Sequence, residues 1–266
     1  ARTVIIGGRR FDAGRGPHIV GVVNLSPESP NQDSVARDAQ AAVARAERLA
    51  AAGATLIDLG AQSSFYDAQL LPVDEEIARL LPALQRLKAA GFQVSVDTWR
   101  AEAAQAALEA GADLINDSDG FQDPAMVGVL ASWGGPLILP FISGPNPHDS
   151  VAFNFEYPLA DIVPFFERAI ERACAVSLHD LILDPGTGYR YRGVSPEEKE
   201  RYQVKVYAAL PQLRARFGFP LLVALPRKES LERTVELARM ILLGADFVRV
   251  HDPAILARLA AEVPQH

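Results

Sequence analysis

Short apolar segments alternate with amphipathic segments along most of the chain. The apolar segments are rich in valine, isoleucine and leucine, and the amphipathic ones repeat their apolar positions at helical spacing. We predict eight β-strands, at 19–25, 55–60, 93–98, 113–117, 136–141, 181–184, 220–225 and 246–252. Nearly continuous apolar strands separated by helices are typical of a parallel sheet that is covered on both faces.

Helical periodicity fills the segments between these strands. The apolar face of the first predicted helix comprises Val35, Ala39, Val43, Ala46 and Ala50. The faces of the next two comprise Ile77, Leu80, Leu84 and Leu87, and then Ala104, Ala107 and Leu108. Further helices are expected near 124–132, 160–175, 196–216, 229–243 and 253–262. Glycines that follow several of these segments, such as Gly53, are typical helix-ending residues.

Eight strand and helix units predict an α/β fold that closes into a (β/α)8 barrel. A length of 266 residues suits one such barrel, and we find no convincing linker, so we predict a single domain over residues 1–266. Residues 3–11 are expected to form an N-terminal β-hairpin that plugs the bottom of the barrel.

Composition narrows the classes of function. The formal net charge is -7 and we find no basic run, which argues against a nucleic-acid partner. No apolar run approaches the roughly 20 residues that span a bilayer, and the N-terminal segment lacks the apolar region of a signal peptide. We therefore expect a soluble, cytoplasmic protein. Cys174 is the only cysteine, and its apolar surroundings predict a buried small residue rather than a nucleophile.

Polar side chains recur where the predicted strands end. In a barrel these positions share one mouth, where active sites are found. One carboxylate or amide at a strand end can simply cap a helix or bind loop amides. Burying several carboxylates together is costly unless a ligand or cation meets them. The positions are Asn24, Asp58, Asp97, Asn116, Asp117, Asp184, Arg249 and His251, with Lys228 just after the seventh strand.

These residue types suggest specific chemistry. Carboxylates and amides around a flat pocket can accept the paired N–H donors of an aminopyrimidinone ring. Arg249, His251 and Asn24 could bind an anionic group or its metal. Lys228 could donate to a ring carbonyl or form a Schiff base, as in barrel aldolases.

The same residues stand in stretches that resemble the successive motifs of dihydropteroate synthases. The resemblance runs in order from about residue 19 to 252. Each motif is weak alone, and seven in register are strong evidence for the superfamily of pterin-binding barrels. They are Asn24–Ser29, Asp58–Gly60, Ser95–Thr98, Ile115–Asp117, Leu183–Gly188, Arg227–Lys228 and Arg249–Asp252.

The resemblance implies a reaction and a set of roles. Dihydropteroate synthases join a dihydropterin that carries a hydroxymethyl diphosphate to p-aminobenzoate, and release pyrophosphate with Mg²⁺ present. By position, the residues that hold the pterin are Asp97, Asn116, Asp184 and Lys228. Those around the diphosphate and the metal are Asn24, Arg249 and His251, with Asn24 as the metal ligand. Asp97, Lys228, Arg249 and His251 are the expected catalytic residues, and the substrate-binding set adds Asp58, Ser64, Gly188 and Glu229. The family also implies a homodimer that associates through the late helices.

Departures from the family pattern cluster on the side expected for p-aminobenzoate. The first loop carries Glu28 and Pro30 where the family has aspartate and an aromatic residue. The second loop, Gly-Glu-Ser-Thr-Arg-Pro in the family, is 61–66 here, and its arginine is absent. Pro140-Phe141 replaces a Met-His pair, and Glu229 replaces a serine that helps receive the carboxylate of p-aminobenzoate. These changes indicate a different or absent second substrate, or sequence drift with Glu229 in solvent. The loop aromatics Phe65, Tyr66, Tyr189 and Tyr191 could wall a different pocket or simply pack the loops.

Four hypotheses remain at this point. The first is a dihydropteroate synthase, and the second is a pterin-binding paralogue with another acceptor or none. The third is a methyltransferase of the same superfamily that uses a folate or methanopterin, which the stretches Ser26–Ser29 and Arg249–His251 make less favoured. The fourth is an aldolase that forms a Schiff base on Lys228.

Overall fold

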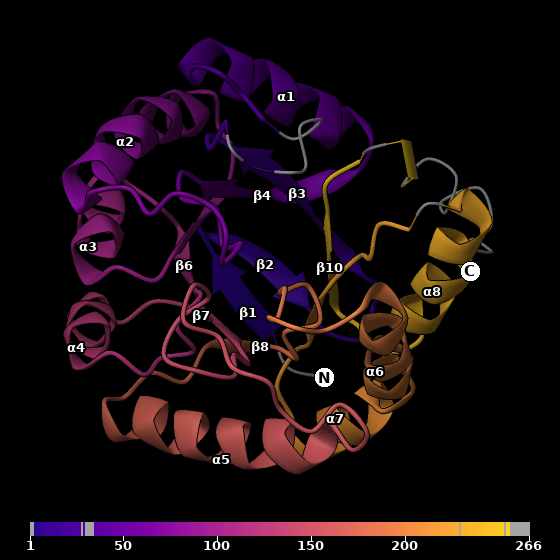
Figure 1. Cartoon of the computed structure of the whole chain (residues 1–266). Helices are drawn as coiled ribbons and strands as arrows, with labels where there is room; N and C mark the ends of the chain where they lie inside the picture. Colours follow the sequence, from indigo (N-terminus) through magenta and orange to yellow (C-terminus); the bar gives the residue numbers. More distant parts are fainter. Residues whose placement is uncertain (1–2, 28, 30–34, 229, 253, 256–266) are drawn as a thin grey trace.

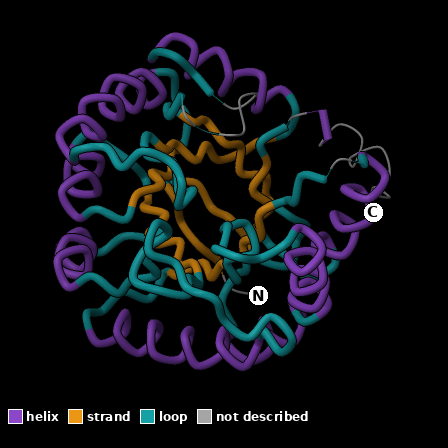
Figure 2. Tube along the Cα trace, viewed as in Figure 1, coloured by secondary structure: helices purple, strands orange, loops and turns teal. Residues whose placement is uncertain are grey.

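Eight parallel strands surrounded by helices form the body of the protein (Figure 1, Figure 2). The computed structural model describes residues 3–27, 29, 35–228, 230–252 and 254–255. The strands are β3 (His18–Asn24), β4 (Ala54–Gly60), β5 (Val94–Thr98), β6 (Leu114–Asp117), β7 (Leu137–Pro140), β8 (Leu181–Asp184), β9 (Leu222–Ala224) and β10 (Phe247–Val250). Their spatial order is β8-β7-β6-β5-β4-β3-β10-β9. A parallel bridge between Leu183 and Leu221 joins the two outer strands, which confirms the predicted (β/α)8 barrel.

The helices lie around the outside of this ring, as Figure 2 shows. They are α1 (Ala39–Ala51), α2 (Val73–Ala89), α3 (Ala101–Glu109), α4 (Pro124–Trp133), α5 (Leu159–Ala175), α6 (Pro196–Ala208), α7 (Leu210–Phe217) and α8 (Leu231–Leu242). A buried apolar cluster that extends from Val23 to Val250 fills the space between strands and helices. None of the helices among the described residues combines the length and the apolar character that crossing a bilayer requires.

The N-terminal hairpin closes one end of the barrel, as predicted. Strands β1 (Thr3–Ile6) and β2 (Arg9–Asp12) pair antiparallel and lie within the ring of strands in Figure 1. Val4, Ile6 and Phe11 are buried. They belong to a second apolar cluster that is supplied by the early residues of the barrel strands: Val20, Leu56, Leu114, Ile138, Ile182, Leu222 and Phe247.

Three details of the predicted helices are wrong. The segment 196–216 forms two helices, because Pro211 stands in the first turn of α7, where its missing N–H is tolerated and a new helix can begin. The buried face of α1 is Ala42, Arg45, Ala46 and Leu49, so of the predicted face only Ala46 is buried. Cys174 is exposed on α5, next to the buried Ala173. The helix predicted at 253–262 lies mostly outside the described residues.

Candidate functional site

Strand alternation separates the barrel interior into an apolar layer and a polar layer. Successive side chains on a strand point to opposite faces of the sheet. A residue two positions after an inward-pointing apolar residue therefore also points into the barrel. Leu56 is followed in this way by Asp58, Leu114 by Asn116, and Ile182 by Asp184. The same step leads from Phe247 to Arg249 on β10. The regular strands therefore bring the predicted polar residues together above the plugged end.

Arg249 is the cation at the centre of this polar layer. Its Nε donates to Asp58 Oδ2 at 2.6 Å, and its Nη2 donates to Asp97 Oδ2 at 3.4 Å. The side chain of Asp58 is completely buried, and that of Arg249 is 19% exposed. A buried carboxylate is tolerated when a cation and hydrogen bonds meet it, so Arg249 makes the position of Asp58 possible.

Two buried oxygen acceptors in this layer have no hydrogen-bond donor among the described residues. Asn116 Nδ2 donates to Asp58 Oδ2 at 3.3 Å. The other side-chain oxygens of the pair, Asp58 Oδ1 and Asn116 Oδ1, are buried and accept no hydrogen bond from the part of the chain that the structure describes. An unsatisfied buried acceptor costs about 1–3 kcal/mol. A ligand with adjacent N–H groups would satisfy both.

Asp184 is buried, and the side chain of Asp97 is 21% exposed at the cavity. Burial, together with the nearby charge of Asp58, raises the pKa of Asp97 to about 7. Burial likewise raises the pKa of Asp184 to about 6, against the opposing effect of a hydrogen bond from Gly186 N. Both groups thus exchange protons near neutral pH, which is common in ligand-binding and catalytic sites.

Backbone geometry fixes the position of Asp184. Its Oδ1 accepts the 2.8 Å hydrogen bond from Gly186 N. Gly186 has φ 75°, and a Cβ at this position would lie 2.1 Å from the carbonyl oxygen of Phe141. Only glycine fits there, so the stretch Asp184-Pro185-Gly186 is a tight turn that returns an amide to its own carboxylate.

Tyr189 and Ser118 complete this side of the mouth. Sequence reasoning named Tyr189 only as a loop aromatic that could wall a pocket or pack the loops, and it missed Ser118. Ser118 Oγ donates to Asp97 Oδ1. Burial raises the pKa of Tyr189, and the charges of Asp97 and Asp184 add to the effect. The loop aromatic Tyr191 has a different role, because it is buried and packs edge-on against Phe153 at 5.0 Å.

A cavity of about 80 Å³ opens beside this carboxylate cluster. Its walls combine amide, hydroxyl, imidazole and guanidinium groups, which are the groups that bind phosphate oxygens. The residues that supply them are Asn24, Ser63, Ser64, Arg190, Arg249 and His251, and the carboxyl of Asp97 lines the same cavity. Burial, and then the charges of Arg249 and Arg45, lower the pKa of His251 to about 3, so its imidazole is neutral at physiological pH.

Arg45 supports the wall of this cavity from behind. It is a buried arginine on α1, 5% exposed. Its Nε donates to the carbonyl of Val22 at 2.8 Å, and its Nη2 donates to the carbonyl of His251. The guanidinium therefore joins β3 to the segment after β10 just where both strands end. Sequence reasoning missed it, although an arginine among small apolar helix residues was a possible signal.

The second loop, between β4 and α2, is organised by Gln62. Its Nε2 donates to the carbonyl of Gln69 at 3.0 Å, and its Oε1 accepts from Leu71 N at 2.8 Å. Arg100 extends the network by donating to the carbonyl of Leu71 and to Glu76. Ser64 lies on this loop at the cavity wall.

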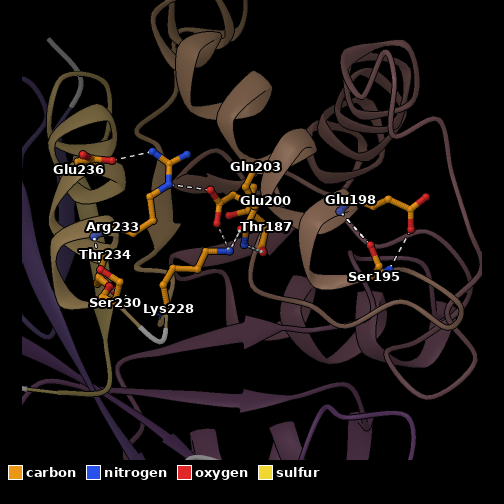
Figure 3. Close-up of polar contacts among 10 residues, drawn as sticks. All are labelled: Thr187, Ser195, Glu198, Glu200, Gln203, Lys228, Ser230, Arg233, Thr234 and Glu236. Atoms are coloured by element: carbon orange, nitrogen blue, oxygen red, sulfur yellow. Dashed lines mark hydrogen bonds and ion pairs between the residues drawn. The ribbon is translucent and has the colours of Figure 1, made fainter.

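Lys228 pairs with a carboxylate of α6, and among the described residues it makes no ion pair with the aspartates inside the barrel. Figure 3 shows its side chain directed toward α6, where Nζ lies 3.2 Å from Glu200 Oε2 and 3.1 Å from Gln203 Oε1. Gln203 in turn donates to the carbonyl of Thr187 at 2.9 Å, on the loop that follows Asp184. Arg233 also binds Glu200, at 2.6 Å.

The structure thus assembles most of the predicted site residues. Asp58, Asn116 and Asp184 lie inside the barrel, and Asn24, Ser64, Asp97, Gly188, Arg249 and His251 line the adjoining cavity. Asp117 points away from them and accepts hydrogen bonds from Asp119 N and Phe121 N, which is the helix-capping or loop-binding role considered above. Glu229, Glu28 and Pro30 lie outside the described residues.

Comparison with known proteins identifies the family. A family model described as "Pterin binding enzyme" matches residues 20–257. The dihydropteroate synthase of Synechocystis sp. is 30% identical over 273 residues, which cover 96% of this chain and 91% of the relative. The type-2 dihydropteroate synthase of Escherichia coli is 34% identical over 88% of this chain and 90% of its own. The solved Xanthomonas albilineans dihydropteroate synthase with 4-aminobenzoic acid has a TM-score of 0.80 and 30% identity, and the match covers 98% of this chain and 99% of that one. The chain therefore belongs to the dihydropteroate synthase family of pterin-binding enzymes.

Proposed function

We propose that this protein is a dihydropteroate synthase. Such a transferase joins the hydroxymethyl carbon of a dihydropterin diphosphate to the amino nitrogen of p-aminobenzoate and releases pyrophosphate. The observation that carries the proposal is the pair of buried acceptors without partners, Asp58 Oδ1 and Asn116 Oδ1, beside the carboxyls of Asp97 and Asp184. Membership of the family supplies the reaction.

The polar layer suits the pterin ring. An aminopyrimidinone presents adjacent N–H groups, and carboxylate and amide oxygens accept them as a pair. Because the pKa of Asp184 is about 6, most of this carboxyl is ionised at neutral pH and can accept such bonds. When the bond between the exocyclic carbon and the diphosphate oxygen breaks, positive charge develops on the pterin, and the carboxylates of Asp97 and Asp184 stabilise it.

The adjoining cavity suits the leaving group. Pyrophosphate departs with the electron pair of the broken C–O bond, while the amino nitrogen of the acceptor forms the new C–N bond and releases a proton to solvent. Arg249, His251 and Asn24 line the cavity and can donate to the phosphate oxygens. A guanidinium, an imidazole and an amide that are held at the strand ends need no rearrangement as the charge develops.

Magnesium is proposed as the companion of the diphosphate. The described residues contain no group of three or more His, Cys, Asp or Glu that could chelate a metal by themselves. Asn24 Oδ1, which accepts from Ser26 N at 2.9 Å, is an oxygen ligand on the cavity wall. Mg²⁺ commonly binds through one or two protein oxygens, substrate phosphates and water, and this donor set fits an ion of that kind. Mg²⁺ would neutralise charge on the departing pyrophosphate.

Turnover tests the proposal directly. The purified protein, 6-hydroxymethyl-7,8-dihydropterin diphosphate, p-aminobenzoate and Mg²⁺ should yield dihydropteroate and pyrophosphate in equal amounts, measured by mass spectrometry and a coupled phosphate assay. Asp184→Asn should reduce kcat/KM by about 100-fold, since it removes a charge that stabilises the transition state. A folded protein that yields no dihydropteroate under these conditions would exclude synthase activity.

A second candidate is a pterin-binding paralogue with a different acceptor. It is favoured by the contents of the second loop, where Phe65 replaces the family arginine and lines the cavity. In that case the pterin diphosphate would bind with unchanged affinity whether or not p-aminobenzoate is present, and other aromatic amines would be the acceptors to test.

Quaternary structure and location are also proposals. We propose a cytoplasmic homodimer that associates through the late helices. Leu231 and Leu243, at the start of α8 and just after its end, are 44% and 84% exposed, so they are apolar side chains that a second subunit could cover. Light scattering should give about twice the mass of 28.7 kDa, and a single-chain mass would refute the dimer.

A further inference from the structure

The charge of Arg249 is already met by carboxylates. Its guanidinium contacts Asp58 at 2.6 Å and Asp97 at 3.4 Å. A diphosphate that entered the cavity would therefore face one cation that is shared with buried aspartates. Neutral donors such as His251, whose pKa is about 3, add hydrogen bonds but no charge. A second cationic side chain of the protein would strengthen the binding of a multiply charged anion in this place, in addition to the Mg²⁺ proposed to accompany it.

Arg190 is a second guanidinium on the wall of the same cavity. It lies on the loop between β8 and α6, and it lines the cavity together with Asn24, Arg249 and His251. Within the described ranges, no carboxylate lies at ion-pair distance from it, and its side chain is exposed at the mouth. Its positive charge is consequently available to a ligand.

The aromatic residue of the second loop holds this arginine. The Cζ atom of Arg190 lies 4.9 Å from the centre of the Phe65 ring, which is a cation–π contact. Such a contact leaves the N–H groups in the plane of the guanidinium free for paired hydrogen bonds to phosphate. Phe65 stands in the second loop at the position where the family has an arginine. The second loop of this chain therefore carries an aromatic ring at that position, and the ring contacts Arg190 of another loop.

We propose that Arg190 supplies the cation that binds the diphosphate of the substrate. The inference deepens the proposed function and rests on it. In the family an arginine of the second loop carries a positive charge. In this chain we assign a positive charge at the cavity to Arg190, in the loop after β8. Phe65 is a positioning residue, since it acts through Arg190.

A neighbouring arginine provides a matched control. Arg192 lies on the same loop and also contacts an aromatic ring of the second loop, with its Cζ 4.6 Å from the centre of Tyr66. Its Nη2 donates to the carbonyl of His148 at 3.4 Å, and it does not line the cavity. Replacing Arg192 removes the same charge from the same loop, and it leaves the cavity wall intact.

Calorimetric titration with inorganic pyrophosphate at fixed Mg²⁺ tests the proposal. Arg190→Gln should weaken binding by about tenfold or more, whereas Arg192→Gln should change it by less than about twofold. Arg190→Lys should recover part of the affinity, because it restores the charge without the planar fork. Phe65→Leu should give a smaller loss than Arg190→Gln. Equal losses in the two glutamine variants, or no loss in Arg190→Gln, would overturn the assignment.

A parallel titration with 6-hydroxymethylpterin, which carries no phosphate, separates the anion from the ring. The affinity for 6-hydroxymethylpterin should be the same in Arg190→Gln as in the unmodified protein. If Arg190→Gln instead weakens p-aminobenzoate and leaves pyrophosphate unchanged, Arg190 binds the acceptor and the proposal is wrong. The titrations require no turnover, so a protein that binds pyrophosphate through Arg190 but makes no dihydropteroate would refute the proposed function alone.

Discussion

The guanidinium of Arg249 and the carboxylate of Asp58 meet at 2.6 Å inside the barrel, although 191 positions separate them in the chain. They belong to β10 and β4, and β3 lies between these strands. The ion pair thus spans the contact between the first and last parts of the barrel. The ion pair also holds the carboxylate of Asp58, whose Oδ1 has no hydrogen-bond donor among the described residues.

Removing the cation alone should be strongly destabilising. Arg249→Met leaves Asp58 buried without its partner, and we expect the free energy of unfolding to fall by about 3–5 kcal/mol. The double variant with Asp58→Asn should be less destabilised than the sum of the two single changes, as urea denaturation would measure. Strict additivity would mean that the pair is not coupled.

The buried arginine behind the cavity should also contribute to stability. Arg45→Met leaves the carbonyls of Val22 and His251 without their donor, and we expect a loss of about 2–4 kcal/mol. Arg48→Met, on the exposed face of the same helix, should cost less than about 1 kcal/mol. Similar costs for the two variants, measured by thermal unfolding, would contradict the structural role of Arg45.

Ionisation of Asp97 predicts how stability depends on pH. Its pKa is raised from 3.8 to about 7, so between these values the folded protein holds a proton that the unfolded chain has released. The free energy of unfolding should therefore decrease as pH rises from about 4 to 7. In Asp97→Asn this decrease should be smaller.

Asp12 is the control for this titration. A hydrogen bond from Thr3, followed by one from Arg10, lowers the pKa of Asp12, so it titrates below the window in question. Asp12→Asn should leave the dependence between pH 5 and 7 unchanged. An identical slope in Asp97→Asn and the unmodified protein would show that Asp97 has no raised pKa.

The turn after Asp184 should tolerate only glycine. Gly186→Ala combines a positive φ with a Cβ 2.1 Å from a carbonyl oxygen, and we expect it to cost at least about 3 kcal/mol. Gly193→Ala has a similar φ of 72° in open space, and should cost about 1–2 kcal/mol. If the two variants unfold at the same denaturant concentration, the turn is less crowded than described.

Sequence patterns were sufficient for the barrel and for much of its polar layer. The two-residue period of the strands places Asp58, Asn116 and Asp184 on one face, so their meeting follows from the register. Helix faces were less certain, because alanine occurs on both sides of α1 and leaves its rotation to be set by Leu49 and Arg45.

Contacts between loops were beyond sequence reasoning. Arg190 contacts Phe65 and Lys228 contacts Glu200 because the segments that follow β4, β8 and β9 meet at one mouth of the barrel, and no local spacing in the sequence encodes those contacts. Ser118 follows a predicted strand end, but nothing in its neighbours indicated a bond to Asp97. The contacts of Lys228 with Glu200 and Gln203 are therefore a part of the site region that sequence patterns did not indicate.

Pterin binding inside the barrel is the claim on which the rest depends, and a calorimetric titration with 6-hydroxymethylpterin measures it most directly. We expect saturable binding at one site, and an affinity at least about tenfold lower in Asn116→Leu, which removes one of the two buried acceptors that lack a donor among the described residues. Absence of binding, or equal affinity in the unmodified protein and Asn116→Leu, would contradict it.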